Sequence, residues 1–344
     1  MKQKSSLDIA KFLCAILVLI IHTDPFGSYS RALSFGFRNV ICVVAVPFFF
    51  ATSGYLLGEK LKSLQTAQEQ NGYMWKYLKR LGVIYLVWSA VYFPFVVVRW
   101  LRAGFGVGSV LEYIKDFFFE GSYSTIWFLP ALMSAALFYW LLRKKLSGKG
   151  VFFVGCGCYV LTLLLSSYYG ITARIPVLSQ LGKAYYWFFD SVKNGLLFGL
   201  VFLSLGAMIS EENTLQQMKR GRSLVGIIVS AFLICAEVVV YKVIGNTRGI
   251  DTIASLLPFT FFALIFVLNI QIQPSRLCVS LRKYSMLIFL CQRIPISVID
   301  LFMNETILAT NTIVNCVVVT AASFAISFLI LQLSKVFKWL NKIY

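Results

Sequence analysis

The sequence predicts an all-helical membrane protein that crosses the bilayer about ten times. Of its 344 residues, 59% are hydrophobic and only 13% are charged, and the mean hydropathy is +0.78. Ordinary soluble domains are less apolar, with about a quarter of their residues charged. The net charge is +18, but the Lys and Arg residues lie between apolar runs instead of forming one patch. This placement indicates membrane topology and argues against a nucleic-acid partner.

Windows of about 20 residues locate apolar segments of the length that a membrane helix needs. They cover residues 7–23, 40–58, 81–98, 127–142, 150–167, 193–210, 224–242, 252–270, 284–301 and 311–333. An even number of spans places both termini on one side. If that side is the cytoplasm, the inner segments hold 20 Lys and Arg residues and the outer loops hold 9, as the positive-inside rule requires. We therefore expect a single domain over residues 1–344 in the cell membrane, with both termini cytoplasmic.

The first segment, Leu7 to Pro25, contains two ionisable residues, Lys11 and His22. They are about three helical turns apart, so in a helix they share one face at a separation of about 16 Å. Ionisable residues inside a span are costly and normally face the protein interior or a wet cavity. His22 is the only histidine of the sequence, so any imidazole chemistry depends on it.

The second and fourth segments contain packing signals. Ser53 and Gly54 are small residues that would let a neighbouring helix approach closely. The fourth segment opens with IWFLPALM, in which Pro130 falls in the first turn, where its missing N–H costs little. Trp127 is either an interfacial anchor or a wall of a binding pocket. The loop between the second and third segments carries Lys79 and Arg80, which either form a solvated basic face or bind the phosphates of a donor.

Three further ionisable residues lie in or beside apolar segments, namely Lys193, Glu237 and Arg293. Glu237 needs a partner, and Lys193 and His22 are expected at a similar depth. Glu237 therefore orients the imidazole, neutralises a cation, or forms a purely structural ion pair. Lys193 orients a ligand or only extends to the interface. Arg293 must find a carboxylate, a carbonyl or a substrate. The eight cysteines have no paired metal-ligand spacing, so we expect no metal site.

Together these motifs resemble the acyltransferase-3 family of integral membrane acyltransferases, whose first helix has a basic residue, ten residues and then His. The segments SGYLL, IWFLPAL and DSVKNGLLF are similar to further motifs of that family. The sequence departs from the family pattern by carrying Lys11 and Lys193 where Arg is usual, and Gln292 and Arg293 where His and Pro are usual. Ammonium is a point charge, whereas guanidinium binds oxyanions through two hydrogen bonds. The layout is most similar to the membrane domain of vancomycin-resistance-type serine racemases.

The resemblance implies transfer of an acyl group, expected to be acetyl, from cytoplasmic acyl-CoA to a hydroxyl or amine of a cell-envelope glycan or a small molecule. Acyl-CoA would be a co-substrate, and no bound cofactor is expected. His22 would be the general base or a transiently acylated residue, and Glu237 would orient it. The donor and acceptor would be bound by the remaining candidates, namely Lys11, Lys79, Arg80, Trp127, Lys193, Asn194 and Arg293.

Two other functions fit the same residues. The racemase resemblance implies a non-catalytic transporter of a small, serine-like amino acid, because a row of buried charges also suits a conduction path. The third hypothesis is a scaffold or regulatory subunit whose active site has lost its activity. A homodimer is a further expectation for the assembly.

Overall fold

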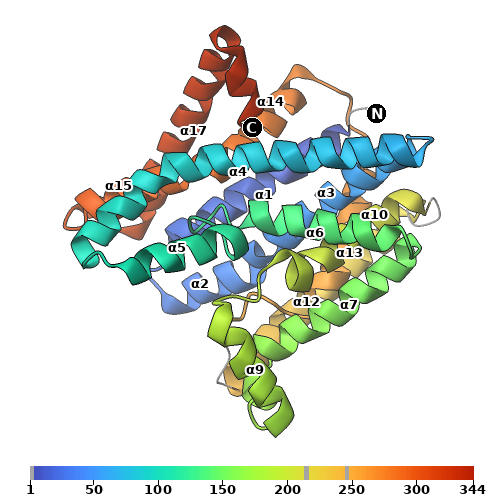
Figure 1. The fold of residues 1–344 in the computed structure, drawn as a ribbon, viewed down its shortest axis with the longest axis horizontal. Coiled ribbons are helices and arrows are strands. Elements are labelled where there is room, and N and C mark those ends of the chain that lie inside the picture. The colour runs from blue at the N-terminus through green and yellow to red at the C-terminus, as the bar shows by residue number, and fades with distance from the viewer. Residues whose placement is uncertain (1–3, 213–216, 245–247) are drawn as a thin grey trace.

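The computed structural model describes residues 4–212, 217–244 and 248–344, which contain helices and no strand (Figure 1). The first half of the chain forms α1 (Ser5–Thr23), α2 (Arg31–Gly36), the short helices η1 (Phe37–Ile41) and η2 (Cys42–Val44), α3 (Ala45–Lys62), α4 (Ala67–Ala103), α5 (Val107–Phe119), α6 (Phe128–Arg143) and α7 (Gly148–Leu165). The second half forms α8 (Tyr169–Thr172), α9 (Pro176–Phe188), η3 (Gly195–Gly199), α10 (Leu200–Glu211), α12 (Arg220–Ile244), α13 (Leu256–Leu268), α14 (Arg276–Cys291), α15 (Arg293–Phe302), α16 (Ile307–Thr310), α17 (Thr312–Val336) and η4 (Lys338–Lys342). The predicted all-α class is confirmed.

Each predicted apolar segment coincides with an apolar helix or helical run. Among the described residues, seven of these runs are long and apolar enough to cross a membrane. The runs that correspond to α6, to η3 with α10, and to α13 are shorter. Because α13 has 13 residues, it extends only about 20 Å, against a hydrocarbon thickness of about 30 Å. The chain is a multi-pass membrane protein, and ten crossings with cytoplasmic termini stay a prediction.

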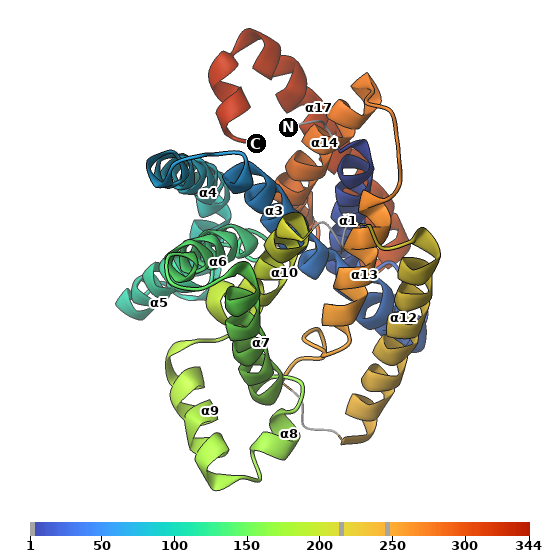
Figure 2. The ribbon, with the colours of Figure 1, turned by 90° about the vertical axis from the view of Figure 1, so that its right-hand side faces the viewer.

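The centre of the bundle is the contact between α3 and α10 (Figure 2). A methyl group added at Gly54 would lie 1.8 Å from the carbonyl oxygen of Leu203, and one at Gly206 would lie 1.8 Å from that of Ala51. The two backbones therefore touch at positions where only glycine fits. This confirms the close approach predicted from Ser53 and Gly54, and α3 also packs against α1.

The predicted span 284–301 contains a break in the helix. α14 ends at Cys291 and α15 begins at Arg293. Pro295 supplies no backbone N–H, so the helical hydrogen bonding cannot continue through this turn. The hydroxyl of Tyr92 donates to the carbonyl oxygen of Leu290 at 2.5 Å. The break places Arg293 one turn from Phe289, which lines both cavities described below.

Candidate active site

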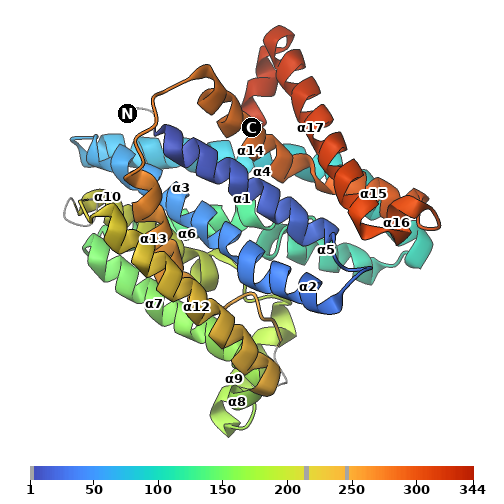
Figure 3. The same cartoon turned by 180° about the vertical axis from the view of Figure 1, so that it is seen from behind.

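The two ionisable residues of α1 line two different cavities. α1 packs against α14 and α3 (Figure 3). Lys11 lines a cavity of about 560 Å³, the Lys11 cavity. His22 lines a pocket of about 110 Å³, the His22 pocket. Both side chains therefore face the protein interior, as their shared helical face predicts.

The His22 pocket is formed by six separate parts of the chain. Its wall comes from α1, the η2–α3 run, the loop before α6 with the start of α6, the η3 region, the loop before α13, and α14. The lining residues are Val18, Ile21, His22, Val43, Val46, Pro47, Thr125, Trp127, Phe128, Lys193, Phe198, Asp251 and Phe289. The wall is thus apolar, with a small set of polar groups that converge on one space, which is the usual composition of a ligand site.

Lys193 enters this pocket as one member of an ion pair. Its ammonium contacts the carboxylate of Asp251, and 34% and 43% of the two side chains are exposed. Three cations, Arg38, Lys193 and Arg293, lie near enough to act electrostatically on His22. The Nε atom of Arg293 is buried and has no hydrogen-bond partner among the described residues. The surroundings of the imidazole are therefore rich in positive charge, which suits an anionic group beside it.

Thr125 is a polar residue of the same pocket that lacks a partner. Its side chain is 1% exposed, and Oγ1 makes no hydrogen bond within the described part of the chain. The loop that carries it is held firmly. The backbone N–H of Ser122 donates to the hydroxyl of Tyr85 at 2.9 Å, and the hydroxyls of Tyr123 and Ser297 are 2.6 Å apart. Because an unsatisfied buried hydroxyl costs about 1–3 kcal/mol, a ligand that accepts from it would recover that cost.

The Lys11 cavity is basic. Four cationic side chains line it, namely Lys11 of α1, Arg80 of α4, and Arg282 and Lys283 of α14. The hydroxyl residues Ser53, Tyr73, Tyr77, Ser285 and Tyr344 also lie in its wall. One Arg80 nitrogen donates to the backbone oxygen of Tyr344 at 3.2 Å. Arginine and lysine side chains that converge in this way bind phosphate groups.

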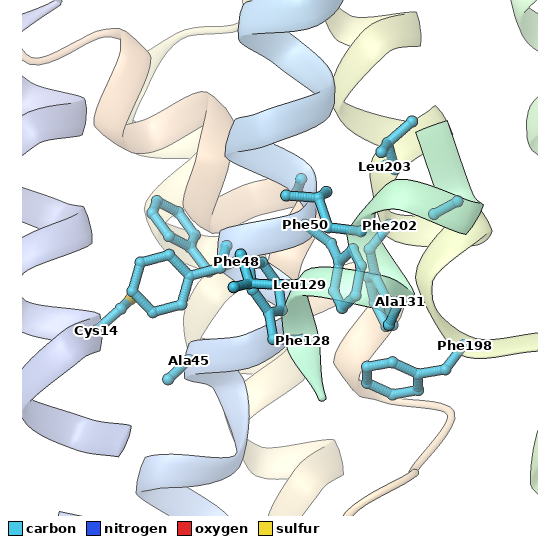
Figure 4. Close-up of a cluster of buried hydrophobic side chains, with 14 of the residues drawn as sticks. Cys14, Ala45, Phe48, Phe50, Phe128, Leu129, Ala131, Phe198, Phe202 and Leu203 are labelled. Carbon is cyan, nitrogen blue, oxygen red and sulfur yellow. The ribbon is translucent and has the colours of Figure 1, made fainter. Parts of the chain in front are cut away.

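Phe128 and Phe289 line both cavities, and their rings pack on Phe49, which lines the Lys11 cavity; we call these three rings the phenylalanine partition. The ring centroids of Phe49, Phe128 and Phe289 are 6.0, 5.7 and 5.4 Å apart in pairs. Phe128 and Phe289 line both the Lys11 cavity and the His22 pocket. Figure 4 shows Phe128 beside Phe50 in a buried cluster that also holds Phe198. Lys11 and His22 therefore line different cavities, and Phe128 and Phe289 stand in the wall of both.

Three of the predicted site residues lie elsewhere. Glu237 accepts hydrogen bonds from Tyr168 at 3.2 Å, Tyr241 at 2.5 Å and the N–H groups of residues 254 and 255 at 2.8 and 2.9 Å. It therefore fixes the start of α13, and it is not among the residues that line the His22 pocket. Asn194 caps η3 by accepting from the N–H of residue 197 at 2.8 Å. Lys79 is exposed and lines none of the cavities described here. The binding and catalytic roles predicted for these three residues stay predictions.

Of the other six predicted residues, five line the two cavities, and Arg293 is not among the lining residues of either. Lys11 and Arg80 lie in the Lys11 cavity, while His22, Trp127 and Lys193 lie in the His22 pocket. Four lining residues were not predicted, namely Thr125, Asp251, Arg282 and Lys283. Arg282 and Lys283 are two adjacent cations at the edge of a span, a pattern that could have indicated a phosphate site but is equally explained by membrane topology. No sequence pattern at Thr125 or Asp251 indicates a site, so these two residues could be found only from the fold.

Residues 4–332 match the family model described as an acyltransferase domain, that of the acyltransferase-3 family. The match covers nearly the whole chain. The chain belongs to the acyltransferase-3 family of membrane proteins.

The curated relatives that this chain is similar to are named as racemases and not as acyltransferases. It is 27% identical to an "Amino-acid racemase" of Enterococcus faecalis over 97% of this chain and 47% of that protein. A second protein of that name and organism is 32% identical over 60% of this chain and 28% of its own length. A "Serine/alanine racemase" of Enterococcus gallinarum is 24% identical over 98% of this chain and 47% of that protein. The chain thus spans half or less of these relatives. No solved structure matches it.

Proposed function

We propose that this protein transfers a short acyl group, expected to be acetyl, from a coenzyme A thioester to a hydroxyl or amine of an acceptor at His22. The observation that carries the proposal is the arrangement of the two cavities. A basic cavity and an imidazole pocket lie along one helix, and two rings of the phenylalanine partition, Phe128 and Phe289, line both. Membership of an acyltransferase family supports this arrangement as a site for acyl transfer.

The donor would bind in the Lys11 cavity. The phosphates of the donor would bind to Lys11, Arg80 and Arg282, three cationic side chains that come from three different helices. Each charge-assisted hydrogen bond to a phosphate is roughly twice as strong as a neutral one. If the termini are cytoplasmic, this cavity opens toward the compartment that supplies acyl-CoA. The thioester would then lie against the phenylalanine partition, and a rotation of its rings would admit the acyl group to the His22 pocket.

The transfer itself would use the polar groups of the His22 pocket. The neutral imidazole of His22 removes the proton from the acceptor hydroxyl or amine as that atom attacks the acyl carbon. A tetrahedral oxyanion forms, and the Lys193 ammonium and the Thr125 hydroxyl are placed to stabilise it. The carbon–sulfur bond then breaks, the thiolate leaves, and the imidazolium gives up the proton. In the alternative route the neutral imidazole itself attacks the acyl carbon and the thiolate leaves. The acceptor then attacks the acyl-imidazole and loses its proton, and the bond between the acyl carbon and His22 breaks.

The racemase names of the relatives support a second candidate function. Proteins similar over 97% and 98% of this chain are named for racemisation of amino acids, which suggests a small amino acid as a ligand. Movement of such an amino acid across the membrane, without covalent chemistry, is the second candidate function that we propose. In that case the two cavities are the two ends of a conduction path, and the phenylalanine partition is its closed gate.

One comparison separates the two functions. Purified protein in lipid nanodiscs is incubated with acetyl-labelled acetyl-CoA and a crude envelope extract, and the same protein in vesicles is tested for uptake of labelled serine. Acyl transfer predicts that His22→Gln lowers acetyl release from coenzyme A by about 10²–10⁴-fold. Equal acetyl release by wild type and His22→Gln, together with saturable serine uptake, would support the transporter and remove the enzyme.

A further inference from the structure

The His22 pocket is small for a ligand site. Its volume is about 110 Å³, whereas drug-sized ligands occupy cavities of about 300–1,000 Å³. At about 30 Å³ for each water-sized group, the pocket has room for about four non-hydrogen atoms. An acetyl group supplies three such atoms, and the attacking oxygen or nitrogen of an acceptor is the next. The pocket therefore has the size of the reacting atoms of an acetyl transfer, with no space for further carbons.

Two buried valines form part of the apolar wall of this pocket. Val18 is 3% exposed and lies one helical turn before His22 on α1, so the two side chains are neighbours on one face of the helix. Val43 of η2 is 6% exposed and also lines the pocket, and η2 packs against α1. Because β-branched side chains have few accessible rotamers, both valines give the space beside the imidazole a fixed width.

The part of the wall that Phe198 forms has little freedom to yield. Its ring is buried and packs on three other aromatic rings. The distances between ring centroids are 6.4 Å to Trp127, 6.0 Å to Phe50 and 5.2 Å to Phe202. A methyl group added at Gly199, the next residue, would lie only 2.7 Å from the ring of Phe50. Because this region is closely packed, moving Phe198 to admit a longer acyl chain would be costly.

Val18 also lies between the two ionisable residues of α1. It follows Lys11 by two turns and precedes His22 by one, so along the helix axis it stands about 10 Å from Lys11 and about 6 Å from His22. Lys11 lines the proposed donor cavity, whereas Val18 and His22 line the pocket. An acyl group that reaches the imidazole from the Lys11 cavity therefore has to fit beside Val18.

We propose that Val18 and Val43 determine which acyl chain this protein transfers, admitting acetyl and excluding chains of four or more carbons. This proposal rests on the acyl transfer proposed above. Replacing either valine by alanine removes two carbons from the wall, which adds space for about two water-sized groups. That gain is the difference in length between an acetyl and a butyryl group, so a single substitution should change the selection.

The test compares acyl donors of increasing length. Purified protein in nanodiscs is supplied with acetyl-, propionyl- or butyryl-CoA labelled in the acyl group, and kcat/KM for acyl release is measured with each donor. Val18→Ala and Val43→Ala enlarge the pocket, and Val18→Ile fills it. Leu19→Val is the matched control, because Leu19 is the next residue of α1, is fully buried and is not among the residues that line the pocket.

One methylene group in a closely packed apolar pocket changes kcat/KM by about 10–200-fold, so wild type should prefer acetyl over butyryl by at least about 100-fold. Each alanine variant should lower this preference at least about tenfold. Val18→Ile should raise the preference for acetyl over propionyl by about tenfold, and Leu19→Val should change neither preference by more than about twofold.

Equal use of acetyl- and butyryl-CoA by wild type would overturn the proposal, as would preferences that stay unchanged in the Val18 and Val43 variants. Acyl release that still depends on His22 in those cases leaves the transfer standing. Acyl release that is equal in wild type and His22→Gln at every chain length removes the transfer, and with it this selection of chain length.

Discussion

Replacing Thr125 by Val should raise stability and lower activity at the same time. The hydroxyl of Thr125 is buried in the His22 pocket, and Oγ1 has no hydrogen-bond partner among the described residues. Valine keeps the branched shape and removes the unsatisfied oxygen. A residue kept only for packing would gain from this change without loss. A residue kept to donate a hydrogen bond to the reacting group would instead lose its function.

The two effects can be sized separately. An unsatisfied buried hydroxyl costs about 1–3 kcal/mol, and part of this should return as added stability in Thr125→Val. Loss of one donor to an oxyanion lowers kcat by about 10²–10³-fold in enzymes where it has been isolated. Because that donor acts mainly in the transition state, KM for acetyl-CoA should change little. Thermal unfolding of the detergent-solubilised protein and steady-state acetyl release measure the two quantities on one preparation.

Thr260 is a built-in control for this prediction. It is also fully buried with an unpartnered hydroxyl, but it lies in α13 and is not among the residues that line the His22 pocket. Thr260→Val should gain stability and keep wild-type activity, and Thr125→Ser, which keeps the hydroxyl, should restore most of kcat. Equal activity of Thr125→Val and wild type would refute the assigned role of this hydroxyl.

Four further outcomes are expected. Phe289→Leu should open the phenylalanine partition and raise hydrolysis of acetyl-CoA in the absence of acceptor by about tenfold. An unchanged rate of hydrolysis would mean that these rings do not control access to His22. Arg282→Gln should raise KM for acetyl-CoA by about 10–100-fold with little change in kcat, whereas Lys79→Gln, being exposed, should leave both unchanged. Asp251→Asn should lower kcat through a displaced Lys193 while changing stability by less than about 1 kcal/mol, because the ion pair is partly exposed; a large loss of stability would assign the pair to folding alone. Burial raises the pKa of the Glu120 carboxyl group above its ordinary 4.5. The folded protein therefore binds the carboxyl proton more tightly than the unfolded chain does. The free energy of unfolding should fall as pH rises from 4.5 through the raised pKa. Glu120→Gln should therefore gain thermal stability relative to wild type as pH rises through that interval, and a difference that does not vary with pH would contradict the shift.

The sequence predicts the helical architecture well, because lipid leaves few other structures for its apolar runs. Each apolar segment corresponds to a helix, and the close approach at Gly54 follows from residue size alone. Periodicity also places Lys11 and His22 toward the interior. These properties depend on local sequence, and so they can be predicted without knowing which helices are neighbours.

The partners of buried groups could not be predicted in this way. Glu237 was expected near His22 because both lie at a similar depth, but depth does not determine the position of a helix around the bundle. The carboxylate instead meets two backbone N–H groups at the start of α13. Asp251 and Thr125 lie outside apolar runs, where only the fold reveals that they face the imidazole. The phenylalanine partition was likewise not predicted, because its rings come from three segments far apart in sequence.

Passage of an acyl group from the Lys11 cavity to His22 can be measured in vesicles that hold the protein in one orientation. Acetyl-labelled acetyl-CoA is supplied only on the side of the Lys11 cavity. We expect labelled acetate or acetylated acceptor to appear on the opposite side, coenzyme A to stay on the side of supply, and His22→Gln to stop this appearance of label. Product and coenzyme A on the same side, or label that crosses equally well with His22→Gln, would contradict it.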